Sequence, residues 1–449
     1  METNSTAKHN GTAHNSTAHK TSERRTSEHY AIISADCHAG LPTEHYRPYL
    51  DSKYHLALDD FLAERKAMLS ARAEAGMSHD EYEEEWTSQE GYSGGWDAAT
   101  RDKELDNDGV VGEIMFPDSD SISGTTCPPF GAGIGATGEL DGDLAFAGAT
   151  AHNRWLAELC ADSPLRRAGV ALVPMVFDVE RAVKMVEESH EMGLRGGIAI
   201  PTMWVNYEPY HHPKYDIVWE RCAALDMPVH VHSGPAPRHE YLDNMGIYVS
   251  EVILWAYRPL RFMLWGGVFE RHPDLKFVVT ESGAYWVPDM LWQMHNQYES
   301  MGGSAKIAKQ LGAAVPRNPV EYFDRNCFLG ASTTKRNELA RRYAIGIDNI
   351  MWGNDFPHPE GTWPHTAEYL RKSFGDIPID ETAQMLGGVA AEVYNFDLEA
   401  LAPTVERIGP TPTDLGQDEL QNQAKWETAK RLGRYWETGT DPAEAFGVL

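Results

Sequence analysis

Short apolar stretches recur along the chain, and each is followed by a segment of helical or loop character. The eight stretches cover residues 31–36, 110–116, 168–174, 196–201, 228–234, 276–282, 327–332 and 349–355. Continuous apolar runs of this length are typical of strands that are buried on both faces of a parallel sheet. We therefore expect parallel strands that alternate with helices.

The segments between these stretches carry apolar residues at helical spacing. In residues 177–193, for example, Val179, Ala182 and Val186 recur on one helical face. Eight strands that alternate with helices are the number found in a TIM barrel, so we predict an α/β fold of the (β/α)8 type. A doubly wound open sheet is the alternative, but no G-x-G-x-x-G or P-loop motif follows a strand.

The chain divides into a leader, a barrel and a terminal extension. Residues 1–29 are rich in Ser, Thr, Asn and His, so we predict a disordered tail. The barrel is expected to occupy residues 30–400. Residues 401–449 form a C-terminal extension, in which residues 417–436 have the pattern of a terminal helix.

Two connections are too long for ordinary turns between a strand and a helix. Residues 43–105 follow the first strand and include a charged helical stretch, and residues 117–150 follow the second strand and are rich in Gly, Pro and Ser. Long loops in a compact domain commonly cover or shape a binding site. Both insertions leave the carboxyl ends of strands, where TIM barrels carry their active sites.

Composition narrows the range of partners. The 449 residues carry a formal net charge of −28, which disfavours nucleic acid and anionic membrane surfaces. The five cysteines are scattered without a C-x-x-C spacing, which indicates neither a disulfide framework nor a zinc ribbon and fits a cytoplasmic protein. The sequence contains neither an apolar run long enough to span a membrane nor the apolar core of a signal peptide.

Polar residues with metal-binding side chains stand where four of the predicted strands end. These residues are Asp36 and His38, His232, Glu281 and Asp355. In a barrel, they would all project from one rim toward the axis, and carboxylates with imidazoles suit Zn²⁺ or Mn²⁺. The sequence therefore predicts one divalent metal site at this rim.

Strand geometry indicates which residues near these positions point toward the metal site and which do not. Side chains alternate between the faces of a strand, so Asp36 and His38 point the same way and Cys37 points away from them. Cys37 is then a small buried residue, not a ligand. His230 shares the face of His232 but lies one layer deeper, and we favour a packing role for it.

Several motifs resemble the amidohydrolase superfamily. They are the D-x-H pair at the first strand, "PVHVH", "GVFERHPDLKFVVTESGAYW" and "MWGNDFPHPEGTW", and the resemblance extends from about residue 31 to about residue 397. They resemble in particular the subgroup similar to aminocarboxymuconate-semialdehyde decarboxylase. The resemblance implies a distorted TIM barrel with one divalent metal ion, Zn or Mn, and either hydrolysis or non-oxidative decarboxylation.

The resemblance also implies a ligand set. The first-strand motif matches Asp36 and His38, the strand-five histidine matches His232, and the strand-eight aspartate matches Asp355. These four residues are the implied metal ligands. In the family, the strand-eight aspartate also transfers protons, which makes Asp355 a candidate catalytic residue.

Glu281 departs from the pattern of the decarboxylase subgroup, which has a histidine at the end of strand six. A glutamate would repel a substrate carboxylate unless it is protonated or bound to the metal, whereas beside metal-activated water it could act as a general base. We therefore expect hydrolysis of a small organic substrate, with Asp355 and Glu281 as catalytic residues. Decarboxylation of an aromatic or unsaturated acid is the first alternative, and an inactive ligand-binding barrel is the second.

Three further residues are candidate substrate contacts. His211 follows the fourth strand, His358 lies three positions after Asp355, and Trp286 follows the sixth strand. Each is also compatible with a structural role in a turn or in packing. A small-molecule substrate is the expected partner, and the family resemblance suggests a homodimer.

Overall fold

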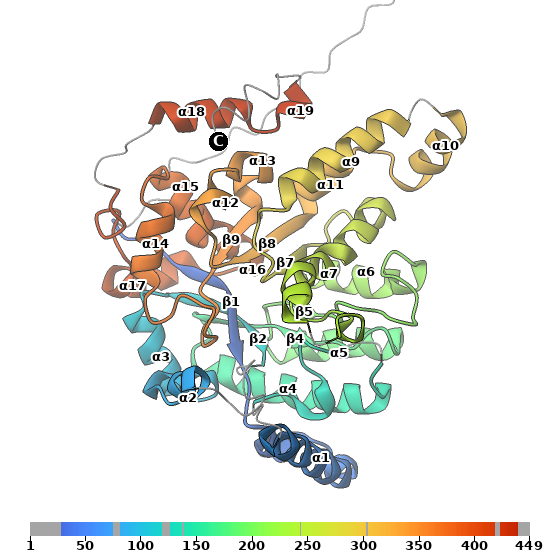
Figure 1. Cartoon of the computed structure of the whole chain (residues 1–449), viewed down its shortest axis with the longest axis vertical. Helices are drawn as coiled ribbons and strands as arrows, with labels where there is room; N and C mark the ends of the chain where they lie inside the picture. The colour runs from blue at the N-terminus through green and yellow to red at the C-terminus, as the bar shows by residue number, and fades with distance from the viewer. Residues whose placement is uncertain are drawn as a thin grey trace, which may run out of the picture.

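Parallel strands surrounded by helices form the centre of the protein, seen here in a computed structural model (Figure 1). The structure describes residues 28–74, 81–118, 126–136, 139–242, 244–301, 304–417 and 423–438. The predicted disordered tail therefore lies outside the described residues, apart from its last two. One of these, His29, places its Nδ1 atom 2.5 Å from the carbonyl oxygen of Gly409.

The strands follow one another around the sheet in the order of the chain. They are β1 (Ile33–Ala39), β2 (Gly112–Pro117), β3 (Arg167–Gly169), β4 (Ala171–Leu172), β5 (Ile198–Ala199), β6 (Val229–His232), β7 (Phe277–Thr280), β8 (Cys327–Ser332) and β9 (Ile350–Gly353). The strands β1, β2 and β3 form one sheet, and the six strands from β4 through β9 form another. Within each sheet, every strand is hydrogen-bonded in parallel to the next one in the chain. All eight predicted strand segments are confirmed.

The gaps between the two sheets are narrow. β3 and β4 are parts of one predicted strand, separated only at Val170, whose N–H donates to the carbonyl of Met115. On the other side, the N–H of His38 donates to Phe356 at 2.7 Å, and the N–H of Asp355 donates to Asp36 at 2.8 Å. The first strand is thereby joined to the last, which gives the distorted TIM barrel that the sequence predicts.

Helices occupy most of the chain between the strands. They are α1 (His55–Glu74), α2 (Glu81–Thr87), α3 (Ala98–Asn107), α4 (Gly142–Asp162), α5 (Val179–Glu191), α6 (Asp216–Ala224), α7 (Met245–Trp265), α8 (Val268–Arg271), α9 (Val287–Met301), α10 (Ala305–Ala314), α11 (Pro319–Asn326), α12 (Arg336–Leu339), α13 (Arg342–Ile345), α14 (Thr366–Phe374), α15 (Ile379–Ala383), α16 (Val389–Tyr394), α17 (Leu398–Ile408), α18 (Gln423–Leu432) and α19 (Tyr435–Thr438). Local sequence explains their starts: Asp178, for instance, caps α5 by accepting from the N–H groups of Glu180 and Arg181.

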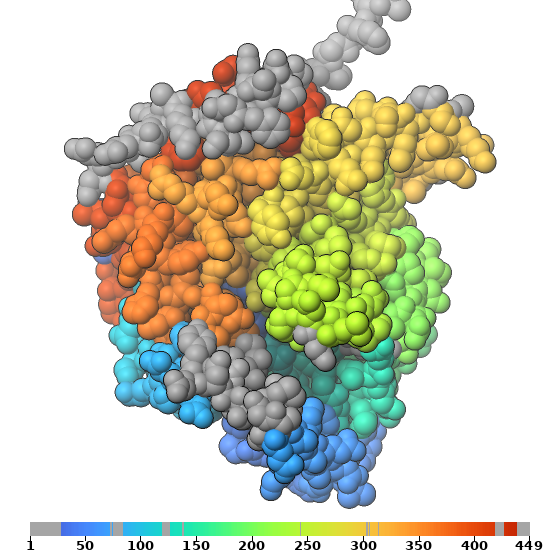
Figure 2. All heavy atoms as spheres, viewed as in Figure 1, coloured from blue at the N-terminus to red at the C-terminus, as the bar shows by residue number. Residues whose placement is uncertain are grey.

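The insertion after the first strand is largely helical. It contains α1, α2 and α3, and the blue α1 protrudes at the bottom of the molecule (Figures 1 and 2). The second insertion, residues 117–150, ends within α4, so its last part is helical and not loop. Among the described helices, none has the length and apolar character needed to cross a membrane.

The C-terminal extension packs against the barrel. The predicted helix in residues 417–436 is divided into α18 and α19, which lie across the top of the view (Figure 1). Trp426 of α18 is buried and donates through Nε1 to the carbonyl of Asp376 at 2.5 Å. α17 crosses residue 400, the predicted end of the barrel, without a break.

Candidate active site

The four predicted metal ligands meet at the carboxyl ends of the strands. Asp36 and His38 project from β1, His232 ends β6, and Asp355 follows β9. Asp36 Oδ1 lies 3.3 Å from His232 Nε2 and 3.5 Å from His38 Nε2, and His38 Nε2 lies 3.2 Å from Asp355 Oδ1. None of the four side chains is more than 2% exposed.

Two of the donor atoms in this cluster lack hydrogen-bond partners. His38 Nε2 and Asp355 Oδ1 are buried and close together, yet neither makes a hydrogen bond within the described residues. Donor atoms of Asp36, His38 and His232 all lie within 4.8 Å of one another. Buried polar atoms normally find partners, and convergent unpaired donors of these types fit one divalent metal ion.

Neighbouring groups orient the ligands. His38 Nδ1 lies 3.2 Å from the carbonyl of Pro117, and His232 Nδ1 lies 2.9 Å from the carbonyl of Ser233. With an ion bound, the Nδ1 atoms would donate to these carbonyls, and the Nε2 atoms would bind the ion. The hydroxyl of Ser332, at the end of β8, donates to Asp36 Oδ2. Sequence reasoning did not identify Ser332, although its place at a strand end was a usable signal.

Two packing features hold the ligand strands in place. A Cβ atom on Gly353 would lie 2.7 Å from Asp36 Cβ, so glycine permits β9 to approach the ligand. Arg101 of α3 is fully buried, donates to the carbonyl of His38 at 2.9 Å, and forms paired hydrogen bonds with Glu113 at 2.8 and 2.6 Å. The first insertion thus supports the backbone of His38, a predicted metal ligand.

The carboxyl groups and imidazole rings of the predicted ligands shift one another's pKa values. Burial alone would raise the pKa of Asp36, but His232 and His38 outweigh it and hold that pKa below its usual range. Burial also opposes ionisation of Asp355, whose pKa is nevertheless lowered by His358 and His38. Burial would lower the pKa of His38, yet Asp355 and Asp36 raise it well above its usual range. Both carboxylates are therefore ionised at neutral pH and can serve as ligands.

Glu281 lies beside the ligands, as its position at a strand end predicts. Its Oε2 atom is 3.3 Å from His232 Nδ1, and its side chain is 25% exposed. Burial and then the negative charges of Asp355 and Asp36 raise its pKa well above the usual range. The glutamate therefore readily holds a proton while no cation is bound next to it.

Three acidic residues at strand ends have left-handed backbones. Asp118, Glu281 and Asp355 follow β2, β7 and β9, with φ angles of 71°, 53° and 60°. Such conformations cost non-glycine residues of order 1–3 kcal/mol and gather at functional sites. Asp118 is new to the site, and its Oδ1 is buried without a hydrogen bond within the described residues. Burial raises the pKa of its carboxyl group, and nearby His38, His358 and His232 partly offset this rise. Its only signal in the sequence was its place after the second strand.

The three candidate substrate contacts differ in their surroundings. His358 is buried, stacks on His38 at a ring distance of 3.9 Å, and places Nδ1 3.1 Å from Asp355 Oδ1. Trp286 stacks on Tyr257 and donates to the carbonyl of Ser282. His211 packs against Phe262 and accepts from Arg271 through its carbonyl. The structure brings His358 into the cluster, and the substrate roles of all three stay predictions.

The deeper layer of the barrel agrees with the packing roles predicted there. His230 Nε2 lies 3.0 Å from the carbonyl of Gly196 and Nδ1 lies 3.4 Å from the hydroxyl of Thr280. Burial lowers the pKa of His230 to about 3, so the ring is neutral. Cys37 is buried, its Sγ is 3.1 Å from Asn354 Oδ1, and burial raises its pKa well above the usual range. Neither residue contributes to the metal cluster.

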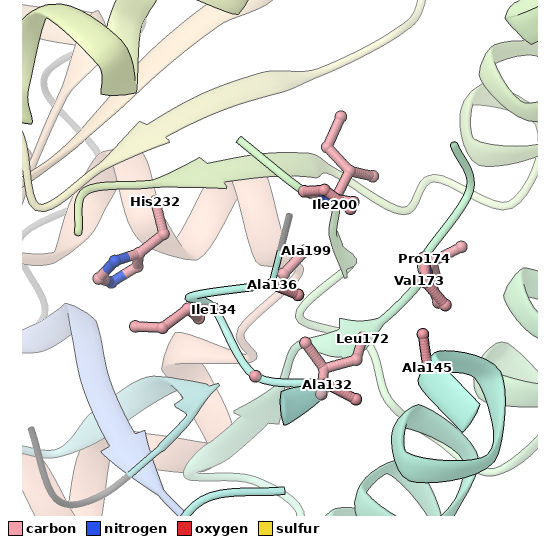
Figure 3. Close-up of a pocket in the computed structure, with 12 residues that line it drawn as sticks. Ala132, Ile134, Ala136, Ala145, Leu172, Val173, Pro174, Ala199, Ile200 and His232 are labelled. Carbon is pink, nitrogen blue, oxygen red and sulfur yellow. The ribbon is translucent and has the colours of Figure 1, made fainter. Parts of the chain in front are cut away.

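An apolar pocket adjoins the cluster at His232 (Figure 3). The space in it that a water-sized sphere can occupy is about 20 Å3. The strand ends at 172–174 and 199–201 form its walls together with Ala145 and the segment 132–136 of the second insertion. His232 lies at one end, and Val173, Pro174 and Ala145 lie at the other. The pocket therefore presents an apolar wall next to the predicted metal ligands.

Comparisons with known proteins agree with this architecture. A decarboxylase of Emericella nidulans is 24% identical over 210 residues, which are 43% of this chain and 59% of that relative. The alignment thus spans less than two thirds of the relative. The 5-carboxyvanillate decarboxylase of Sphingomonas paucimobilis superposes with a TM-score of 0.57 at 19% identity, covering 82% of this chain and 100% of the other.

A second solved structure is a dihydroxybenzoic acid decarboxylase from a Polaromonas species with bound manganese and the inhibitor 2-nitroresorcinol. It superposes with a TM-score of 0.55 at 19% identity over 82% of this chain and 97% of the other. These likenesses support the barrel fold. The sequence itself matches the amidohydrolase family over residues 35–396. Because this match covers most of the chain, the protein belongs to the amidohydrolase family of enzymes.

Proposed function

We propose that the protein is a metal-dependent decarboxylase that removes CO2 from an aromatic or unsaturated carboxylic acid. The observation that carries the proposal is the apolar pocket that ends at the metal ligand His232. Among the residues that line it, His232 is the one polar side chain. Apolar walls of this kind favour contact with the apolar part of a substrate whose polar end reaches the metal cluster.

The similar proteins point the same way. The relative from Emericella nidulans and the two superposed structures are all named as decarboxylases. The sequence expectation of hydrolysis rested on Glu281, which would repel a carboxylate while it is ionised. The raised pKa of Glu281 reduces this objection, because a protonated glutamate does not repel the substrate.

The chain supplies binding and proton transfer. Asp36, His38, His232 and Asp355 would hold the ion, which when bound would supply a positive charge for the substrate's oxygen atoms. The pocket walls would orient the apolar part of the substrate and exclude water from it. We assign Mn²⁺ or Zn²⁺ to this position, with Mn²⁺ supported by the structure that binds manganese.

Glu281, or Asp355 once it has taken up a proton, would donate that proton to the carbon that bears the carboxylate. The bond from that carbon to the carboxylate then breaks, its electron pair stays on the carbon, and CO2 leaves. The overall change replaces the carboxylate with hydrogen and consumes one proton. Glu281 lies next to the predicted ligands, and Asp355 is both one of them and the proton-transferring residue that the family resemblance implies.

Hydrolysis is the second candidate, and the position of Glu281 favours it. A carboxylate 3.3 Å from His232 could remove a proton from water beside the cluster. In that reaction, Glu281 or Asp355 acts first as a base and then as an acid toward the leaving group. A homodimer and a cytoplasmic location stay predictions for either reaction.

The experiment that separates the two reactions uses the Mn²⁺-loaded protein with two panels of substrates. Hydroxylated benzoic acids and unsaturated acids are assayed for CO2 release, and amides, esters and lactones of similar ring size are assayed for hydrolysis. The proposal predicts CO2 release from at least one acid, reduced by about 10²–10⁴-fold in Asp355→Asn. Hydrolysis without CO2 release would contradict it.

A further inference from the structure

The first insertion, residues 43–105, contacts two segments that carry predicted metal ligands. One segment is β1 with His38, and the other is the stretch after β9 with Asp355, far away along the chain. His38 Nε2 and Asp355 Oδ1 lie 3.2 Å apart, so both segments must be held in place for one ion to bind both residues. Helices α2 and α3 of the insertion lie at the lower left of the view and reach both segments (Figure 1).

Arg101 of α3 makes the contact with β1. Its side chain is fully buried, and Nη1 donates to the carbonyl of His38 and to that of Gly94 within the insertion, both at 2.9 Å. Nε and Nη2 donate to the carboxylate of Glu113 on β2, and this paired contact fixes the plane of the guanidinium. The guanidinium also lies over the ring of Phe356, whose carbonyl accepts from the N–H of His38. Arg101 thus joins the insertion, β1, β2 and the segment after β9.

The pairing of β1 with β2 is irregular where β1 carries its ligands. The register shifts between Ser34 and Cys37, on either side of Asp36. An irregularity of this kind changes the direction of side chains and interrupts the regular ladder of backbone hydrogen bonds. Arg101 supplies a hydrogen bond to the carbonyl of His38 just beyond this point. The side chain therefore supports β1 where its own pairing is weakest.

Trp86 of α2 makes the contact with the segment after β9. Its Nε1 atom donates to the carbonyl of Pro357 at 2.9 Å, and Pro357 lies between Asp355 and His358 in the chain. Its ring also packs edge to face against Trp363, with 5.5 Å between the ring centroids. The indole therefore restrains the stretch of chain that carries Asp355.

The insertion holds these segments without lining the apolar pocket. Trp363 Nε1 donates to Glu104 of α3 at 3.3 Å, and the N–H of Gly40, next to β1, donates to the carbonyl of Gly95 at 3.0 Å. Among the described residues that line the pocket, none belongs to residues 43–105. The contacts of α2 and α3 therefore act on the segments that carry the predicted ligands and not on the pocket walls.

We propose that the first insertion sets the affinity for the metal ion by holding β1 and the segment after β9 together. Arg101 and Trp86 are the positioning residues, since each contacts a backbone carbonyl at or near a predicted ligand and neither side chain is itself a ligand. Loss of either contact lets His38 or Asp355 move away from the ion. Substitution of residues that support metal ligands typically lowers metal affinity by about 10–100-fold. The proposal is independent of the reaction that the protein catalyses.

Trp86→Phe is the mildest test, because it keeps an aromatic ring against Trp363 and removes only the N–H that reaches Pro357. We expect the dissociation constant for Mn²⁺ to rise about tenfold. The matched control is Trp255→Phe. Trp255 of α7 also donates through Nε1, to the hydroxyl of Tyr241 at 3.0 Å, but it lies outside the insertion. The control should bind Mn²⁺ as the wild type does.

Arg101→Lys should have the larger effect. Lysine keeps the positive charge, but its single ammonium group cannot reproduce the paired contact with Glu113 together with the bond to His38. We expect the dissociation constant to rise about a hundredfold. Arg167→Lys is the control, because Arg167 of β3 is equally buried, donates to the carbonyl of Leu159 at 2.7 Å, and has no predicted ligand among its described contacts. It should lower the free energy of unfolding but leave the affinity for Mn²⁺ unchanged.

The dissociation constants are obtained from the electron paramagnetic resonance signal of free Mn²⁺, at a temperature at which circular dichroism shows each variant to be folded. A rise in each variant with unchanged controls supports the proposal. An unchanged constant in either folded variant, or an equal rise in its control, would overturn it. If Arg101→Lys does not fold, Trp86→Phe decides the question alone. The measurement needs no substrate, so a failure of the decarboxylation assay leaves its result intact.

Discussion

The rim of the barrel and the layer below it use the same residue types in different surroundings. β6 contributes His232 to the rim and His230 to the deeper layer, and both are buried. His230 is enclosed by a carbonyl and a hydroxyl, and burial lowers its pKa to about 3. His232 instead lies 3.3 Å from each of two carboxyl groups, those of Asp36 and Glu281.

The surroundings of these two histidines, and not their residue type, distinguish a predicted ligand from a packed residue. Residue type and burial are the same in both layers, so neither identifies the metal site. The distinguishing features are the nearby carboxylates and the buried atoms without partners, such as His38 Nε2 at the rim. The comparison predicts that substitutions in the rim remove metal and activity, whereas substitutions below it change stability.

The largest effect is expected for His232→Ala. The variant loses one of four ligands, so we expect metal affinity to fall by more than about a hundredfold and turnover to disappear. Bound metal is measured after dialysis against a fixed Mn²⁺ concentration. His211→Ala serves as the control, because His211 packs against Phe262 away from the ligand set. Full metal content in His232→Ala would remove this residue from the site.

Asp355→Asn should follow in size. The amide cannot transfer the proton, so we expect turnover to fall by about 10²–10⁴-fold. Glu281→Gln is measured in parallel, with metal content determined for both variants. A variant that keeps both its metal and full activity rules its residue out as the acid or base.

His152 extends the comparison to a buried histidine of α4. Burial lowers its pKa to about 3, whereas an unfolded histidine titrates near 6.5. The unfolded state therefore binds more protons between these values, and stability is lost as pH falls from about 6.5 toward 3. At pH 5, His152 accounts for about 2 kcal/mol of this loss. Urea unfolding of His152→Gln from pH 7 to 5 should show a shallower decline than the wild type, and an equal decline would contradict the assignment.

His230→Gln tests the deeper layer. The substitution disturbs the contacts to Gly196 and Thr280, so we expect the free energy of unfolding to fall by about 1–3 kcal/mol. Metal content should equal that of the wild type, because His230 lies outside the ligand set. A loss of bound metal in a folded variant would place His230 among the ligands. The rim and the layer below it would then no longer differ in metal binding.

Cys37→Ala should have the smallest effect. Cys37 faces Asn354 and its thiol is buried with a raised pKa, so it is neither a ligand nor a nucleophile. We expect full metal content and most of the activity, together with insensitivity of the wild type to thiol-alkylating reagents. Inactivation by alkylation at Cys37 would point to thiol chemistry instead.

The sequence predicted the strands because strands buried on both faces appear as continuous apolar runs. It also predicted Asp36, His38, His232 and Asp355 as neighbours, since the carboxyl ends of barrel strands share one rim. It did not identify Asp118, which follows β2 and has a left-handed backbone that no sequence pattern here indicates. Ser332 was also missed, although it ends a strand; its contact with Asp36 joins β8 to β1, which are far apart in the sequence.

The pocket lay beyond sequence reasoning for a related reason. Its walls come from β4, β5 and the second insertion, and apolar residues in these segments look the same whether they line a cavity or fill a core. The orientation of Glu281 likewise depends on long-range packing. Period-two patterns assign a face to a strand residue, but they do not place a side chain that follows the last paired position.

Anomalous scattering from crystals of the Mn²⁺-loaded protein tests the central claim most directly. We predict a manganese peak within coordination distance of Asp36, His38, His232 and Asp355, at the His232 end of the apolar pocket. The absence of a peak among these residues at saturating Mn²⁺, or a peak bound only by other side chains, would contradict the account.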